Sequence, residues 1–238
     1  MTANKYDGAW SFSRLMDYEQ CPYRFYLKVV AKAEQPEIPD DHPMVRGRRI
    51  HEEVEHYISL QTDAFPSSGK KLQELLAECR DRYDHGSATV EEKWGFTTDW
   101  APVGWWEDGV WCRMATDYHE RVDTDAEIII DWKTGKSFGN EVKYMQQMQL
   151  YSVGAFMRNP KLEFLDVKLA FLDDGKVRIK SFQRGDKINK LTARFTERAM
   201  RLSNTVDFRP KPSLMNCKYC PFGSQHGTGA CLHAVEPL

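Results

Sequence analysis

A buried apolar run that ends in an acid and a lysine constrains the fold of this chain more than any other feature. Ile128–Ile130 are followed directly by Asp131, Trp132 and Lys133. This pattern predicts a strand over residues 127–132 that lies inside a sheet. Residues two apart on a strand point to the same face, so we expect Asp131 and Lys133 to project together and Trp132 to point away.

The periodicity of the remaining chain predicts helices on both sides of a set of strands. We expect helices over 11–30 (with a kink or restart at Pro22), 44–60, 70–84, 141–157 and 186–203, and strands over 88–97, 109–122, 165–172 and 176–182. The last helix carries an apolar face formed by Ile188, Leu191, Phe195, Ala199 and Leu202.

This order of elements predicts an α/β or α+β fold with a mixed central sheet flanked by helices. We expect three segments: a helical segment over 1–43, a core over 44–208 and a cysteine-containing tail over 209–238.

A second acid precedes the strand motif at a distance that suits a hairpin. Asp117 stands fourteen residues before Asp131, which allows one strand, a turn near 123–126 and a return strand. The two carboxylates then converge at one end of the sheet, where oxygen ligands suit Mg²⁺ or Mn²⁺. Lys133 adds a fixed positive charge beside them. The alternative is a surface ion pair between Asp131 and Lys133, with Asp117 in a turn.

A histidine and an acid share one face of the predicted helix over 44–60. His51 and Glu55 are four residues apart. The imidazole would complete a coordination sphere and favour Mn²⁺. The alternative is a helix-surface histidine beside a solvated acid.

Four cysteines suggest a second metal site. Cys217 and Cys220 form a CxxC pair, Cys231 follows, and Cys21 lies near the other end of the chain. Four thiolates suit either zinc or an iron–sulfur cluster. Cys79 and Cys112, on a predicted helix and strand, complete the six cysteines, and we expect both to be buried, unpaired thiols.

The overall charge and hydropathy of the chain argue against two classes of protein. A formal charge of −2 argues against a protein that binds nucleic acid by bulk electrostatics alone, although it allows a local basic channel. No apolar run reaches the roughly 18 to 20 residues that cross a bilayer, and the start MTANKYDGAW does not resemble a secretion signal. We therefore expect a cytoplasmic protein.

Basic and aromatic residues near these motifs are candidates for contact with nucleic acid. Candidates for a phosphate-binding channel are Arg46, Arg48, Arg49 and Lys136; solvated surface positions are an equal alternative for the arginines. Five tryptophans also lie close together in the sequence. For Trp94, Trp100, Trp105, Trp106 and Trp111 we favour core packing over stacking on bases.

Five motifs, in order, resemble the RecB-like branch of the PD-(D/E)xK nuclease superfamily. They are SFSRLMDYEQCPYRFYL, GRRIHEEVE, RMATDYHERV, IIIDWKTGK and QMQLY, and they extend through most of the chain. The chain departs from the family pattern at Ala115–Thr116, where glycine is frequent, and at Asp131, where glutamate is more usual. The resemblance implies a restriction-endonuclease-like fold.

The resemblance also implies roles for individual residues. His51, Asp117, Asp131 and the carbonyl of Trp132 would ligate one or two Mg²⁺ or Mn²⁺ ions, and Lys133 would be catalytic. Gln147 and Tyr151 would contact DNA or support Lys133, and Glu55 is a weaker correspondence.

Relatives with one cysteine before the core and three after it typically hold a 4Fe–4S cluster, as in CRISPR-associated and phage exonucleases. The resemblance therefore favours this cluster over zinc at the four cysteines, joining the two ends of the chain. The gap between Cys220 and Cys231 is longer than is usual, which makes His226 and His233 alternative ligands.

Together these features predict a metal-dependent DNA exonuclease that acts on single strands or duplex ends. The resemblance places it in recombination, repair or CRISPR-type processing in a bacterial, archaeal or phage-infected cell, with protein partners of those systems. The alternatives are a catalytically silent DNA-binding or scaffold module with an iron–sulfur or zinc site, and a zinc-containing interaction protein.

Overall fold

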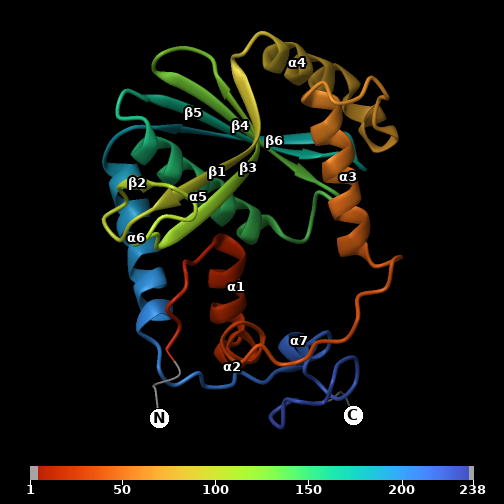
Figure 1. The fold of residues 1–238 in the computed structure, drawn as a ribbon, viewed down its shortest axis with the longest axis vertical. Helices are drawn as coiled ribbons and strands as arrows, with labels where there is room; N and C mark the ends of the chain where they lie inside the picture. Colours follow the sequence, from red (N-terminus) through yellow and green to blue (C-terminus); the bar gives the residue numbers. More distant parts are fainter. Residues whose placement is uncertain (1–4, 236–238) are drawn as a thin grey trace. The chain divides into compact units, whose positions relative to one another are not determined.

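Residues 5–235, described by a computed structural model, contain one mixed six-stranded sheet of order β2-β1-β3-β4-β5-β6 (Figure 1). Its strands are β1 (Ala88–Phe96), β2 (Pro102–Val103), β3 (Cys112–Arg121), β4 (Ala126–Lys133), β5 (Phe164–Phe171) and β6 (Lys176–Gln183). The β4–β5 pair is parallel and the other pairs are antiparallel. This arrangement confirms the α/β class with a mixed sheet. The short strand β2 was not predicted.

The helices also follow the sequence pattern. They are α1 (Phe12–Gln20), α2 (Pro22–Phe25), α3 (Pro43–Ile58), α4 (Gln73–Asp84), α5 (Glu141–Arg158), α6 (Asp186–Asn204) and α7 (Leu214–Cys217), with a π-helical turn over Tyr26–Val30 and a 3-10 turn over Ser67–Leu72. The predicted break at Pro22 separates α1 from α2, because proline at the first position of a helix lacks the N–H that would continue the preceding one. Within the described residues, no helix is long and apolar enough to cross a membrane.

The chain divides into two compact units. Pro39–Ala193 forms the sheet unit, and the described parts of Met1–Ile38 and Arg194–Leu238 form the terminal unit. The described residues from both ends of the chain therefore pack within one unit. The division into segments at residues 43 and 208 stays a prediction.

The terminal unit has an aromatic core of its own. Phe25 is fully buried and its ring packs edge-on against Tyr6, with 5.1 Å between the centroids, and against Tyr18 at 5.9 Å. Arg198 and Glu19 form a two-point ion pair with both N–O distances at 2.7 Å. This ion pair connects α1, the first helix of the chain, to α6 near position 200.

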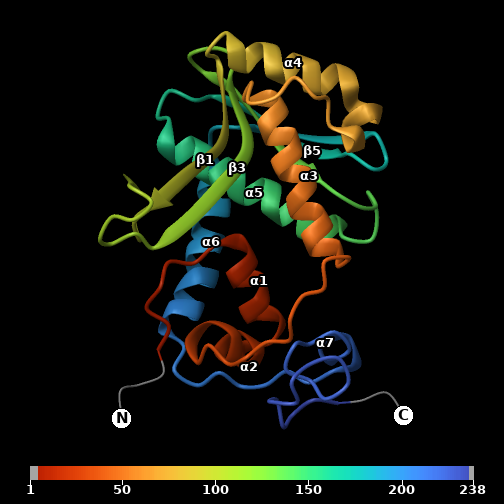
Figure 2. The same ribbon diagram turned by 45° about the vertical axis from the view of Figure 1, so that its right-hand side comes forward.

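In the sheet unit, helices cover both faces of the sheet (Figures 1 and 2). One face packs against α3 and α4 through a core that includes Val54, Leu76, Tyr118 and Trp132. The other face packs against α5, which connects β4 to β5. Ile129, Ile130 and Trp132 of β4 are buried, and Ile128 is half-buried against the core with α3 and α4, so the isoleucine run lies largely inside the sheet unit as predicted.

The alternation of side chains reverses partway along β1 and β3. Ala88 and Tyr118 belong to the core with α3 and α4. Further along the same two strands, a Cβ atom at Gly154 of α5 would lie 2.7 Å from Met114 Sδ and 3.1 Å from Trp94 Cε3. Even-numbered residues of β1 pair with even-numbered residues of β3, so in a regular strand pair all four side chains would point to the same face. Here two of them face α3 and α4 and the other two face α5, so the alternation of side chains reverses between these positions.

The exchange coincides with an irregular residue. The bridges Val90↔Tyr118 and Glu92↔Thr116 flank Glu91, which has a φ of +49°. A non-glycine residue in this left-handed region is strained and locally turns the strand. Glu91 is therefore the position at which β1 changes the faces of its side chains.

A charged network lies on the α5 side of the exchange. His119 is 4% exposed, and its Nδ1 and Nε2 atoms lie 2.6 Å from Glu92 and 3.0 Å from Glu127. Arg158 and Asn159 donate to the second oxygens of these carboxylates at 2.6 and 2.8 Å. Burial opposes the charge on His119, but its two hydrogen-bonded carboxylates outweigh it and raise the pKa. Each ring nitrogen thus faces a carboxylate oxygen.

The close approach of α5 predicts the effect of a larger residue at position 154. Gly154→Val should lower the free energy of unfolding by about 1–3 kcal/mol, because the new side chain overlaps Met114 and Trp94. Urea unfolding monitored by circular dichroism measures this change. Met114→Ala removes one overlap, so the double variant should lose less stability than the sum of the two single variants. Strict additivity would contradict the packing described.

Candidate active site

The end of β4 presents an acid and a lysine on one side of the strand. The Nζ atom of Lys133 forms an ion pair with Asp131 Oδ2, and the Asp131 side chain is almost fully buried. Trp132 points the opposite way into the core with α3 and α4. The structure therefore brings Asp131 and Lys133 together, as the period of the strand predicted.

Helix α5 fixes this pair through two residues one turn apart. Gln147 donates from Nε2 to Asp131 Oδ1 at 2.8 Å, and its Oε1 accepts from Lys133 Nζ at 3.0 Å. The Tyr151 hydroxyl lies 2.9 Å from Asp131 Oδ1 and 3.1 Å from the carbonyl of Ala115. The amide thus contacts both charged groups, each with the atom of complementary polarity.

Asp117 lies beside the pair and connects it to α3. Its Oδ2 accepts the backbone N–H of Trp132 at 2.7 Å and lies 3.5 Å from His51 Nδ1. The last bridge of the β3–β4 ladder is Tyr118↔Ile130, so Asp117 and Asp131 stand opposite each other just beyond it. The hairpin with a turn near residues 123–126 produces this arrangement, as predicted.

Glu91 was not predicted and completes a candidate metal site. One ligand atom from each of His51, Glu91 and Asp117 lies within 4.8 Å of the other two. Glu91 reaches this position from the irregular point of β1. The sequence shows an acid there but not its register against Asp117, which depends on the long connection between β1 and β3. A site for a cation therefore forms between α3, β1 and β3.

The electrostatics of the site fit a cation. Burial raises the pKa of Glu91, and the charges of Asp117 and Glu55 raise it further. Burial likewise raises the pKa of Asp131, with Lys133 opposing the shift and Asp117 adding to it. Crowded carboxylates with raised pKa values carry more negative charge than their surroundings stabilise, and a divalent cation would relieve this.

Neighbouring carboxylates raise the pKa values of the two basic groups of the site despite their burial. Burial alone would lower the pKa of His51, but the hydrogen bond and charge of Asp117 outweigh it and raise the pKa. The pKa of Lys133 is also raised, because the attraction of Asp131 exceeds the cost of burial. A metal at His51 would displace the imidazole proton, since a histidine ligand binds in its neutral form.

The arginines proposed for a phosphate channel have different surroundings. Arg46 forms a two-point ion pair with Asp173, with N–O distances of 2.7 and 3.0 Å. Asp173 also accepts the N–H of Gly135 at 2.7 Å, so Arg46 supports the loop that follows Lys133. Arg48 is exposed, as is Arg49, which lies 3.9 Å from Glu53.

Lys136 extends from the same loop, and its ammonium lies 5.4 Å from the ring centroid of Phe138. Among the tryptophans, Trp94, Trp100 and Trp111 are buried as expected. Trp105 is half-buried, and the prediction of core packing is wrong for Trp106, which is 81% exposed because it lies in the loop between β2 and β3.

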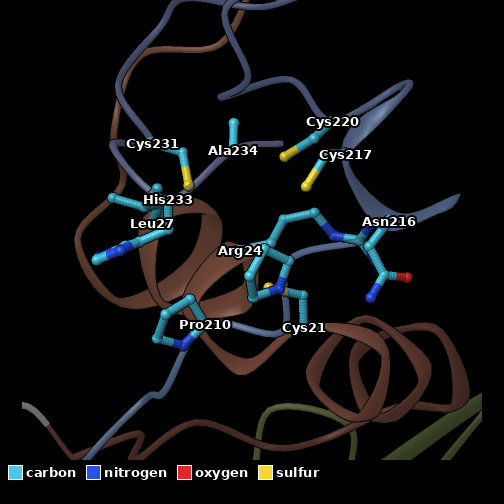
Figure 3. A pocket seen from close by; sticks show the side chains of 11 residues that line it. Cys21, Arg24, Leu27, Pro210, Asn216, Cys217, Cys220, Cys231, His233 and Ala234 are labelled. Atoms are coloured by element: carbon cyan, nitrogen blue, oxygen red, sulfur yellow. The ribbon is translucent and has the colours of Figure 1, made fainter. Parts of the chain in front are cut away.

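The terminal unit contains the four cysteines at one pocket (Figure 3). Cys21, Cys217, Cys220 and Cys231 line it, although Cys21 comes from the opposite end of the chain. The backbone N–H of Lys211 donates to Cys21 Sγ at 3.5 Å. The four cysteines line the same pocket, which makes them candidate ligands for zinc or an iron–sulfur cluster.

Other residues near this pocket differ in their suitability as ligands. His233 lines the pocket, with its ring edge-on to Tyr23 at 5.2 Å, whereas His226 stacks on Tyr219. Burial raises the pKa of the Cys220 thiol.

The two remaining cysteines, Cys79 and Cys112, lie in the sheet unit and are buried, unpaired thiols, as predicted.

The family of the chain follows from comparison with known sequences. A family model described as the PD-(D/E)XK nuclease superfamily matches residues 9–127 and 119–225, well over half of the chain. The chain belongs to this superfamily. PD-(D/E)XK nucleases use divalent metals, in agreement with the acidic site at His51, Glu91 and Asp117. A search of curated proteins finds no match.

Several solved structures are similar to this chain at low sequence identity. A candidate exonuclease from Eubacterium rectale is 14% identical, with a TM-score of 0.50, and the match covers 90% of this chain and 88% of that one. SSO0001 is 15% identical with a TM-score of 0.47, covering 98% and 90% of the two chains. An alkaline exonuclease from Laribacter hongkongensis is 15% identical with a TM-score of 0.37, covering 81% and 88%. The family match and the mixed six-stranded sheet with flanking helices fit a restriction-endonuclease-like α/β fold, and the similarity to the Eubacterium rectale structure agrees with this fold.

Proposed function

We propose that this PD-(D/E)XK nuclease is a Mg²⁺- or Mn²⁺-dependent DNA exonuclease that hydrolyses single strands or duplex ends. The observation that carries the proposal is the convergence of His51, Glu91 and Asp117 within 4.8 Å, beside the ion pair of Asp131 and Lys133. A held cation and a fixed positive charge at one place together supply what metal-dependent hydrolysis of a phosphodiester uses: activation of water and stabilisation of charge on the phosphate oxygens. Recombination, repair or CRISPR-type processing in the cytoplasm, with the corresponding protein partners, remains part of this proposal.

The acidic residues and His51 would hold one or two cations in this mechanism. His51, Glu91 and Asp117 would form one set of ligands, and Asp131, with the carbonyl of Trp132, would supply further oxygens next to it. A bound divalent cation supplies Lewis acidity to the phosphate and increases the acidity of water. Asp117 connects the two sets, because its carboxylate lies between His51 and the backbone of Trp132.

Lys133 and its partners would stabilise the charge of the reacting phosphate. Gln147 positions the ammonium group of Lys133 and the carboxylate of Asp131 at the same time. Tyr151 holds the Asp131 oxygen that does not contact Lys133. Because these bonds exist before substrate binds, little reorganisation is needed during the reaction. Gln147 and Tyr151 are thus positioning residues, and Lys133 is the catalytic one.

This assignment predicts the outcome of a cleavage assay. With Mn²⁺ present, the wild type should shorten end-labelled linear DNA, whereas Asp131→Asn and Lys133→Gln should each be slower by about 100-fold or more. Lys161→Gln, a surface lysine away from the site, serves as the matched control and should retain activity. Covalently closed circles should persist, because they have no ends. Equal rates for the wild type and both site variants would refute the assigned roles.

We also propose that the four cysteines hold a 4Fe–4S cluster. The proposal is supported by the four thiols around one pocket, and by the backbone N–H of Lys211 directed at Cys21 Sγ. Hydrogen bonds of this kind to cysteine sulfur tune the properties of such clusters. The role would be structural, because a cluster would cross-link residues near both ends of the chain.

The cluster proposal predicts the metal content of the protein. Anaerobically purified protein should contain about four iron and four sulfide ions per chain and absorb visible light. Cys217→Ser should lose iron and unfold at a lower temperature, while Cys112→Ser, at a buried cysteine outside the pocket, should retain the iron. One equivalent of zinc in place of iron would contradict the proposal.

A further inference from the structure

Trp106 is exposed in a way that ordinary packing does not explain. It lies in the loop between β2 and β3, and 81% of its surface is accessible. Large aromatic side chains are usually buried because they contribute more apolar area than other residues. An exposed indole of this kind is typical of a surface that binds another molecule.

The exposed ring is held in place by its neighbours. The guanidinium of Arg113 lies 4.7 Å from the ring centroid of Trp106 and 5.5 Å from that of Trp105. Arg113 Nε also donates to the carbonyl of Trp105 at 2.8 Å. The loop itself is anchored where Glu107 accepts the N–H of Gly104 at 2.7 Å. Binding to a ring that is already positioned loses little conformational entropy.

Gly95 allows the loop to lie close to the sheet. A Cβ atom at this position would be 2.8 Å from the carbonyl oxygen of Val103 and 2.9 Å from that of Gly104. Gly95 also pairs with Arg113, so the arginine and the loop meet at one point of the strand pair. The segment that carries Trp106 is therefore packed directly against the β1–β3 strand pair.

The same strand pair connects the loop to the candidate metal site. Beyond Glu91, the exchanged alternation places Trp94 and Met114 toward α5, so Lys93 and Arg113 lie on the opposite face. Lys93 is exposed and stands two residues, about 7 Å, from Glu91. Arg113 stands four residues, about 14 Å, from Asp117. Lys93, Arg113 and Trp106 thus lie along the same face of the β1–β3 pair, at increasing distance from the acids of the candidate metal site.

We propose that Lys93, Arg113 and Trp106 bind the single-stranded part of a nucleic acid, with an unpaired base stacked on the Trp106 indole. Stacking on aromatic rings does not depend on base identity, and cations beside the rings neutralise phosphates. Bases inside a duplex are already stacked and are not available to the ring. The inference rests on the proposed function, because it specifies that a single nucleic-acid strand, and not a duplex, leads to the metal site.

Binding of labelled strands without metal tests this inference separately from hydrolysis. Fluorescence anisotropy in EDTA compares an ordinary single strand, the same strand with abasic sites, and a blunt duplex. Trp106→Ala should weaken binding of the ordinary strand by about 5- to 100-fold, which corresponds to about 1–3 kcal/mol for one stacked base. Trp106→Phe should retain most of the affinity. Phe164→Ala, an exposed aromatic at the start of β5, is the matched control and should bind as the wild type does.

The abasic strand distinguishes contacts to bases from contacts to phosphates. The wild type should bind the abasic strand about as weakly as Trp106→Ala binds the ordinary strand. Trp106→Ala should bind the abasic strand with the same affinity as the wild type does. Lys93→Gln should weaken both strands equally. Unchanged binding of the ordinary strand by Trp106→Ala, or an equal loss on ordinary and abasic strands, would overturn the proposal. Binding as expected without cleavage in Mn²⁺ would instead refute the exonuclease function alone.

Discussion

The carboxylate of Asp117 is the group on which the site geometry depends. One of its oxygens accepts the N–H of Trp132 at 2.7 Å and lies 3.5 Å from His51. These two contacts join β3 to the end of β4 and to α3. They set the distance between the helix that carries the imidazole and the strand that carries Asp131 and Lys133.

The site concentrates negative charge in a buried place. Asp131 is almost fully buried, and it shares the region with Asp117 and Glu91. Lys133 neutralises part of this charge, and its own pKa rises as a result. Burying like charges together costs stability, and clusters of this kind are typical of functional sites. A bound divalent cation would offset the repulsion between these carboxylates, in keeping with the PD-(D/E)XK superfamily.

Much of this arrangement could be predicted from local sequence. The period of two placed Asp131 and Lys133 together, and the short hairpin brought Asp117 to them. The apolar spacing of the last long helix predicted the buried positions of α6, including Phe195 and Leu202. These predictions succeeded because each depends on residues close in sequence.

The remaining features depend on contacts that the sequence pattern does not encode. Glu91 enters the site because a left-handed residue exchanges the faces of β1, and neither its φ nor its register against β3 is visible in the sequence. Arg46 pairs with Asp173, which is distant in the chain. Trp106 stands between the buried Trp100 and Trp111 in the sequence, yet it is exposed in a loop that lies close to Gly95.

Locating Mn²⁺ by anomalous diffraction from a crystal grown with this ion tests the central claim most directly. The account predicts a peak in contact with His51, Glu91 and Asp117, where the strand irregularity at Glu91 directs its carboxylate. A peak bound without Glu91, or an ion held at a different surface of the sheet unit, would contradict it.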